Sequence, residues 1–365
     1  MSHSERLSRR VGPGLLLQFP CRFPTPFKSR APPATIPPGS GFFHLALYSV
    51  FRVWGPKFMK ATYHPGIHKY AVFVVCWTAC LLTAGALVTS NDAALAVSDW
   101  PTSFGTFFPP LRLLHGGAGI EHTHRVVAAI LGIWIIVLAA LLWRYDERPW
   151  LKKLGLVAVA GVVFQGVLGG LTVLQLLHYW LPVMHACTAE LMFAILVSIA
   201  FFTSHWYMQD LPQYADSNVP SIHFVVTVNA CLIFFQVLLG AGFRHHYISY
   251  VPHVFGSLIV LTSVIWTAGT LRRRFPEVPS ISRARLFLHA LVGLQILLGL
   301  GSLWSRITTA DAPQPMPVMI AFTVVHTVVG AFLFATSIVT VLLCYRLVPR
   351  KREVLFATTK GEVPA

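Results

Sequence analysis

Long apolar stretches alternate with short polar segments through most of this 365-residue chain. Several of the stretches run past the ~18 uncharged residues that mark a membrane-spanning helix. The pattern predicts eight spans, near residues 70–90, 124–143, 155–177, 182–203, 223–243, 250–271, 286–305 and 316–345. We therefore expect an all-α membrane protein with eight transmembrane helices.

The pattern repeats at about half the chain length, because the segment that begins at Gln165 in the third span matches the one that begins at Gln295 in the seventh. Each repeat holds four spans, an even number, so both copies enter the membrane in the same direction. We expect two tandem, parallel-repeat four-helix bundles, in residues 66–205 and 206–345.

Four histidines occupy matching places in the repeats, near the start of every second span: His124, His185, His253 and His326. The second and fourth helices of a repeat run in the same direction, so each repeat holds two histidines near one face of the membrane. Two imidazoles at matching depth are the ligands that six-coordinate haem iron needs. A polar packing role is the alternative for any single intramembrane histidine, and the repetition favours haem ligation.

The densest polar cluster opens the second span at residues 121–125, Glu-His-Thr-His-Arg. Glu121 lies on the same helix face as His124, and Arg125 lies on an adjacent face. Glu121 could transfer a proton beside a haem, and Arg125 could pair with a haem propionate. The alternative is that Glu121 only complements the helix dipole and Arg125 marks the membrane interface. The spacing does not choose between these two interpretations, and the role of a second intramembrane carboxylate, Glu190, is open.

Composition agrees with the membrane class, since 55% of the residues are hydrophobic and 11% are charged. The formal net charge of +15 would suit a nucleic-acid partner. The basic residues, however, gather after the second, sixth and eighth spans, where the positive-inside rule places cytoplasmic loops. We therefore expect no nucleic-acid partner, cytoplasmic termini and a cytoplasmic tail at residues 346–365.

Residues 1–65 are basic and rich in proline, and they hold no span. We expect a disordered leader, or a start codon assigned too early with translation beginning at Met59. Because this leader contains no convincing cleavable signal, the inner membrane of a bacterium is the expected location. The mitochondrial inner membrane is the alternative.

Several of these segments together resemble the haem A synthase family: residues 85–90, 99–101, 121–125 and 165–173, with His185. The resemblance covers about residues 66–345. It implies a membrane oxidoreductase that converts the C8 methyl group of haem O to a formyl group by successive hydroxylation. The product, haem A, serves cytochrome c oxidase.

The resemblance also implies roles for individual residues. His253 and His326 would hold the iron of a resident haem b, whereas His124 and His185 would flank the haem O that is oxidised. Glu121 would match the glutamate that the oxidation needs, and Arg125 would belong to the substrate site. The implied partners are haem O, the haem O synthase that supplies it as a candidate, an electron donor that the sequence does not identify, and membrane lipid; a homo-oligomer is left open.

Two features depart from the family pattern. Some members carry a cysteine pair in the first outer loop, where this chain has Val97 and Ser103, so a thiol-dependent step is not expected here. His253 is followed by Val254 rather than by an arginine like Arg125. This asymmetry fits one catalytic site and one electron-transfer site.

Two other functions would use the same histidines. A bis-His dihaem b-type membrane electron-transfer protein would pass electrons without chemistry on the porphyrin. A parallel-repeat transporter would use the histidines for a proton or metal path. Replacing Glu121 with glutamine would abolish formation of the formyl haem by a synthase, whereas it would leave the activity of an electron carrier almost unchanged. A transporter would be distinguished from both because it would bind no haem.

Overall fold

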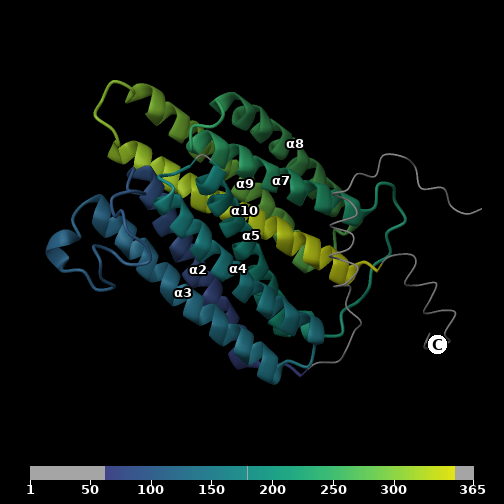
Figure 1. The fold of residues 1–365 in the computed structure, drawn as a ribbon. Helices are drawn as coiled ribbons and strands as arrows, with labels where there is room; N and C mark the ends of the chain where they lie inside the picture. The colour runs from purple at the N-terminus through teal and green to yellow at the C-terminus, as the bar shows by residue number, and fades with distance from the viewer. Residues whose placement is uncertain (1–61, 179, 350–365) are drawn as a thin grey trace, which may run out of the picture. The chain divides into compact units, whose positions relative to one another are not determined.

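The computed structural model describes residues 62–178 and 180–349. In these ranges, eight helices are long and apolar enough to cross a membrane (Figure 1). They are α2 (Pro65–Ser90), α3 (Gly117–Tyr145), α4 (Pro149–Leu174), α5 (Trp180–Thr203), α7 (Ile222–Arg244), α8 (Tyr250–Arg274), α9 (Pro279–Thr308) and α10 (Pro317–Leu347). The predicted class, an all-α multi-pass membrane protein with eight spans, is confirmed. Nearly all of the expected leader (residues 1–61) and most of the expected tail (residues 350–365) lie outside the described residues.

Four helices begin five to seven residues earlier than hydropathy predicts, since α2 begins at Pro65 and α4 at Pro149 where the apolar windows begin near residues 70 and 155. α3 begins at Gly117 and α9 at Pro279, whereas the apolar windows begin near residues 124 and 286. A hydropathy window counts Arg283 and Arg285 against a span, yet a helix satisfies its own backbone hydrogen bonds and continues through polar residues. Proline also suits the first turn of α9, since its missing N–H has no partner there.

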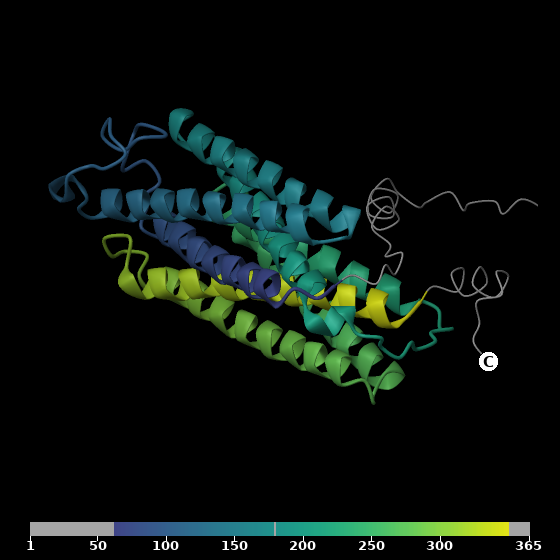
Figure 2. The ribbon, with the colours of Figure 1, turned by 90° about the horizontal axis from the view of Figure 1, so that it is seen from below.

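The eight helices form two groups with the same order of neighbours. In the first group α2 contacts α3, α3 contacts α4, α4 contacts α5, and α5 returns to α2. In the second group α7, α8, α9 and α10 follow the same closed order. Figure 2 shows α10 (yellow) alongside α9 (green) in this group. This order agrees with two four-helix bundles, while the tandem, parallel relation of the copies stays a prediction.

α10 packs at the boundary between the two groups, where it contacts α2 and α5. Ala331 and Ala335 of α10 pack against Phe193 of α5, and Val75 of α2 packs against the same cluster. Small side chains at these positions let the helices approach closely, which is the main source of packing energy between helices in lipid. Of the most apolar 18-residue window of each helix, 56% is buried in α10 and 11% in α9. α10 is therefore a central helix and α9 a peripheral one.

A loop of residues 91–116 joins α2 to α3 and contains one 3₁₀ turn, η1 (Leu111–Leu113). We call the end of the helices that carries this loop the outer end. The connections from α4 to α5, from α7 to α8 and from α9 to α10 lie at the same end, because successive helices alternate in direction. A short helix, α6 (His205–Met208), lies in the connection between the two groups at the opposite end.

Candidate functional site

The four predicted histidines lie in the first third of α3, α5, α8 and α10, near the outer end. The ring centroids of His253 and His326 are 6.2 Å apart, and their planes make an angle of 82°. His124 and His185 lie within electrostatic reach of each other. The structure therefore brings His253 and His326 together as a pair, and it places His124 and His185 near each other in the other helix group.

Each imidazole rests against a glycine of the helix that precedes its own. A Cβ atom added to that glycine would lie 3.2 Å from Cε1 of His124, 3.3 Å from that of His185, 2.9 Å from that of His253 and 3.1 Å from that of His326. The glycines are Gly85 in α2, Gly169 in α4, Gly240 in α7 and Gly299 in α9. The same contact thus recurs at all four histidines.

Three of these histidines carry a buried ring nitrogen that no described residue pairs. Nδ1 of His124, His185 and His326 is buried and has no hydrogen-bond partner among the described residues. A buried polar atom without a partner costs about 1–3 kcal/mol, which a bound group can recover. Three of the four histidines therefore have a ring nitrogen whose hydrogen bond the described residues do not supply.

The donor set and the spacing both fit haem. Two metal–imidazole bonds of about 2 Å, with roughly 1 Å from each bonded nitrogen to its ring centre, separate two ring centres by about 6 Å. The measured 6.2 Å between His253 and His326 agrees with this value. Across the described part of the chain, no three His, Cys, Asp or Glu side chains gather in a metal-binding group. Two histidines suit an iron that already has four porphyrin nitrogens and do not suit a bare zinc ion.

Glutamines support three of the histidines from the preceding helix. Nε2 of Gln236 lies 3.1 Å from Nδ1 of His253 and donates to the His253 carbonyl at 2.7 Å. Nε2 of Gln295 lies 3.3 Å from Nε2 of His326. Gln165 donates to the backbone carbonyl of His185 at 3.2 Å. These amides fix where each imidazole-bearing turn sits relative to the neighbouring helix.

Glu121 and Arg125 form an ion pair one helical turn apart on α3. The second carboxylate oxygen of Glu121, which is only 3% exposed, accepts the backbone N–H of Val97 at 2.8 Å. The Arg125 guanidinium donates to the carbonyls of Asp99 at 2.6 Å, Thr102 at 2.7 Å and Val97 at 3.0 Å. Both side chains therefore bind the outer loop, which favours a loop-holding role for Arg125 over direct pairing with a propionate.

The rest of this loop is held in the same way. Nδ1 of His122 lies 3.0 Å from the hydroxyl of Ser103, and the Trp100 ring lies against Gly170 of α4. Hydrogen bonds to the Asp99 carboxylate, first from the Thr102 hydroxyl and also from backbone N–H groups, lower the pKa of Asp99 to about 2. Val97 and Ser103 are thus both tied to α3 by hydrogen bonds.

Replacing Arg125 with alanine is expected to release residues 97–106 from α3. The change removes three bonds to loop carbonyls and leaves the largely buried Glu121 without its counter-charge, a loss of about 3 kcal/mol or more. A loss of stability of this size should accelerate hydrogen–deuterium exchange of these loop amides by about tenfold or more. The control is Arg112→Ala, which removes an exposed arginine from the same outer end. Unchanged exchange in Arg125→Ala would contradict the loop-holding role.

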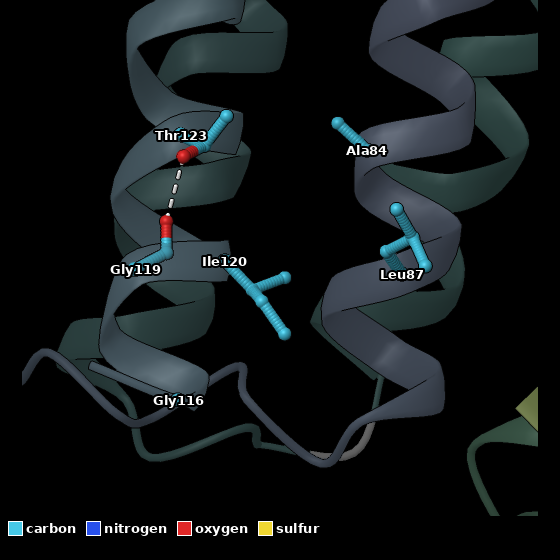
Figure 3. A pocket seen from close by; sticks show the side chains of 6 residues that line it. All are labelled: Ala84, Leu87, Gly116, Gly119, Ile120 and Thr123. Carbon is cyan, nitrogen blue, oxygen red and sulfur yellow. Dashed lines mark hydrogen bonds between the residues drawn. The ribbon is translucent and has the colours of Figure 1, made fainter. Parts of the chain in front are cut away.

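A shallow groove of about 270 Å³ lies beside the Gly85–His124 contact, between the outer ends of α2 and α3. Figure 3 shows Ile120 of α3 directed toward Leu87 of α2 across this groove. The one hydroxyl in the wall, on Thr123, donates to the carbonyl of Gly119 in its own helix at 2.7 Å. The groove is therefore lined mainly by apolar groups.

Comparison with known proteins identifies the family. The family model described as cytochrome oxidase assembly protein (COX15-CtaA) matches residues 39–197 and 115–252, which together span more than half of the chain. The chain belongs to this family. The matched residues include Glu121, His124 and His185 and end just before His253. The match therefore covers the positions of the first histidine pair, and the second pair lies outside it.

Several curated relatives are haem A synthases. The chain is 27% identical to the one from Shouchella clausii over 241 residues, which is 57% of this chain and 78% of the relative. It is 33% identical to the one from Caulobacter vibrioides over 126 residues, and 34% identical to the one from Halalkalibacterium halodurans over 91 residues. These two alignments span 32% and 24% of this chain, and 37% and 30% of the relatives.

The sequence did not reveal the contacts that surround the predicted residues. Gln236 was missed, although Gln165, Gln236 and Gln295 each stand four positions before a glycine that touches a histidine. That Gln-x-x-x-Gly spacing was the available signal. Glu190, whose role the sequence left open, is 6% exposed, and its Oε2 atom has no hydrogen-bond partner within the described ranges.

Proposed function

We propose that this protein is a haem A synthase, which oxidises the C8 methyl group of haem O to a formyl group by successive hydroxylation. The observation that carries the proposal is a pair of imidazoles 6.2 Å apart in the second helix group, together with a first pair whose buried Nδ1 atoms lack partners. Membership of the cytochrome oxidase assembly protein family and the named relatives support it. Haem A is a cofactor for cytochrome c oxidase, so the function agrees with an assembly role.

The two histidine pairs would divide the work. His253 and His326, each of which has a glutamine beside its ring, would hold a resident haem b by both iron positions. His124 and His185 would flank the substrate haem O. A methyl C–H bond is too strong for acid–base chemistry alone, so the bound haem would supply the redox chemistry that the side chains cannot.

The side chains around the first pair would position the substrate and move protons. The Glu121 carboxylate lies one turn from His124 on the same helix face and is shielded from solvent. It is a candidate to transfer a proton at the haem edge. Arg125, bound to the carbonyls of the outer loop, would keep that loop closed over the outer end and so limit access of water.

We propose the inner membrane of a bacterium as the location, with both chain termini in the cytoplasm. Arg272, Arg273 and Arg274 in the last turn of α8, and Arg144 in that of α3, lie at the end opposite the outer loop. Short loops rich in arginine stay on the cytoplasmic side. The haem O synthase and an electron donor are the proposed partners.

A time course with membranes tests the function. Membranes that contain the protein, supplied with haem O and a reductant in air, should first produce hydroxylated haem O and then the formyl haem. The control is the same membranes from cells without the gene. A dihaem electron carrier would change the oxidation state of its own haems and leave the added haem O unmodified, and that result would overturn the proposal.

A further inference from the structure

We propose that Gly85, Gly169, Gly240 and Gly299 are positioning residues that set the ring orientation of the four haem-ligating histidines. The inference rests on the proposed function, because it assumes that the histidines bind haem. It concerns residues that contact the imidazoles from the preceding helix and do not themselves reach a haem iron.

The distances show that no larger residue fits beneath the rings as they stand. A Cβ atom would lie 2.9 Å from Cε1 at Gly240 and 3.1 Å from Cε1 at Gly299. Ordinary carbon–carbon contacts are about 3.5–4.0 Å. Alanine at either position would therefore displace the imidazole by several tenths of an ångström.

The cost of that displacement depends on whether the ring is bound. A free imidazole is the end of a rotatable side chain, so it can turn away from a new methyl group with little strain. An imidazole bonded to iron has a fixed direction and cannot turn away without distorting the bond. We therefore expect alanine to disturb the haem-bound state and to leave the folding of the apoprotein nearly intact.

The glycines belong to a repeated local pattern, which argues against chance contacts. Gly169, Gly240 and Gly299 each follow a glutamine by four positions, and this spacing puts both residues on one helix face. The glutamine supports the histidine-bearing turn from one side while the glycine lets the ring approach the helix. At Gly85 the corresponding residue is Leu81, so His124 has the glycine contact without the glutamine.

Other glycines in α9 separate this role from general helix packing. A Cβ at Gly293 would meet no atom within 4 Å, so Gly293→Ala is an open-space control on the same helix. A Cβ at Gly301 would lie 2.5 Å from the Phe322 ring, so Gly301→Ala is a packing control that touches no histidine. Loss of helix packing and loss of ring orientation can therefore be measured separately.

The experiment uses the full-length protein, purified as Gly299→Ala, Gly240→Ala, Gly293→Ala and Gly301→Ala. Haem b per protein is measured by pyridine haemochrome, and the ligand field of the iron by the low-spin electron paramagnetic resonance signal. We expect Gly299→Ala and Gly240→Ala to lower the haem content about tenfold or to shift that signal, as is typical when a residue that orients a metal ligand is changed. Gly293→Ala should match the wild type, and Gly301→Ala should lower thermal stability without a shifted signal in the haem that remains bound.

Several results would overturn the inference. Wild-type haem content and signal in both Gly299→Ala and Gly240→Ala would show that the rings do not depend on these glycines. Failure of both variants to accumulate, while Gly293→Ala accumulates, would assign the glycines to folding. A wild-type protein that carries no haem would overturn the proposed function together with the inference, so the two failures are distinguishable.

Discussion

Glutamine in place of Glu121 is expected to lower conversion of haem O by about 100-fold or more, the usual effect of removing a general acid or base. The amide oxygen can still accept the Val97 N–H, which Glu121 accepts at 2.8 Å, but the ion pair with Arg125 is lost, so exchange of the outer-loop amides is measured in the same variant. The amide cannot carry or release a proton at neutral pH. The measurement is haem O conversion per protein in membranes, with bound haem b measured in the same samples.

The control for this variant is Glu147→Gln, which neutralises an exposed glutamate outside the membrane-spanning helices. It should convert haem O at the wild-type rate. If Glu121→Gln also converts haem O at nearly the wild-type rate, Glu121 only holds the loop through Val97 and Arg125, and the proton-transfer role is wrong. Loss of haem b from Glu121→Gln would instead indicate that the variant is misfolded, and exchange of the loop amides would show this.

Alanine in place of His326 is expected to remove most of the resident haem b. The amount of haem b per protein should fall by about tenfold or more. The variant removes the imidazole whose centroid lies 6.2 Å from that of His253. His253 is then the single side-chain ligand of that iron. A six-coordinate iron with one imidazole lost binds more weakly and loses its low-spin character. Pyridine haemochrome and the electron paramagnetic resonance spectrum measure both effects.

His289→Ala is the matched control for His326→Ala. His289 lies on α9, is exposed, and its ring bonds the Arg285 carbonyl of its own helix at 3.0 Å. Removing it should leave the haem content unchanged. A full complement of low-spin haem b in His326→Ala would contradict the assignment of the second pair.

The two pairs differ in a way that fits different tasks. The rings of His253 and His326 each have a glutamine side-chain nitrogen within 3.3 Å. His124 has no such glutamine, and its helix carries Glu121 and Arg125, both bonded to the outer loop. The first group thus combines a less restrained ring with an ionisable cluster, which suits a substrate that must enter, react and leave.

The sequence predicted the helices well because hydropathy is a local property. Each of the eight spans depends on the apolar content of its own segment. A long apolar segment in lipid forms a helix because its backbone N–H and C=O groups must bond to one another. The starts of α2, α3, α4 and α9 were misplaced, because polar first turns such as the one with Arg283 and Arg285 carry no hydropathy signal.

The sequence also indicated the four histidines, because they occupy matching positions in the two repeats. It did not indicate what the histidines touch. Gly240 and Gln236 acquire their roles only because α7 lies beside α8 in the folded chain. Arg125 was expected to meet a propionate, and its loop contacts depend on how residues 97–102 fold back over α3.

The central claim, oxidation of haem O at the first histidine pair beside a resident haem b, is tested most directly by the haems that the protein carries. The wild-type protein is purified from cells grown with and without a source of haem O, and its haems are extracted with acid–acetone and separated by chromatography. We expect haem b in both samples, and haem A or hydroxylated haem O only where haem O was supplied. Haem b alone in both samples, with haem O supply and reductant verified, would contradict the claim and favour an electron-transfer protein.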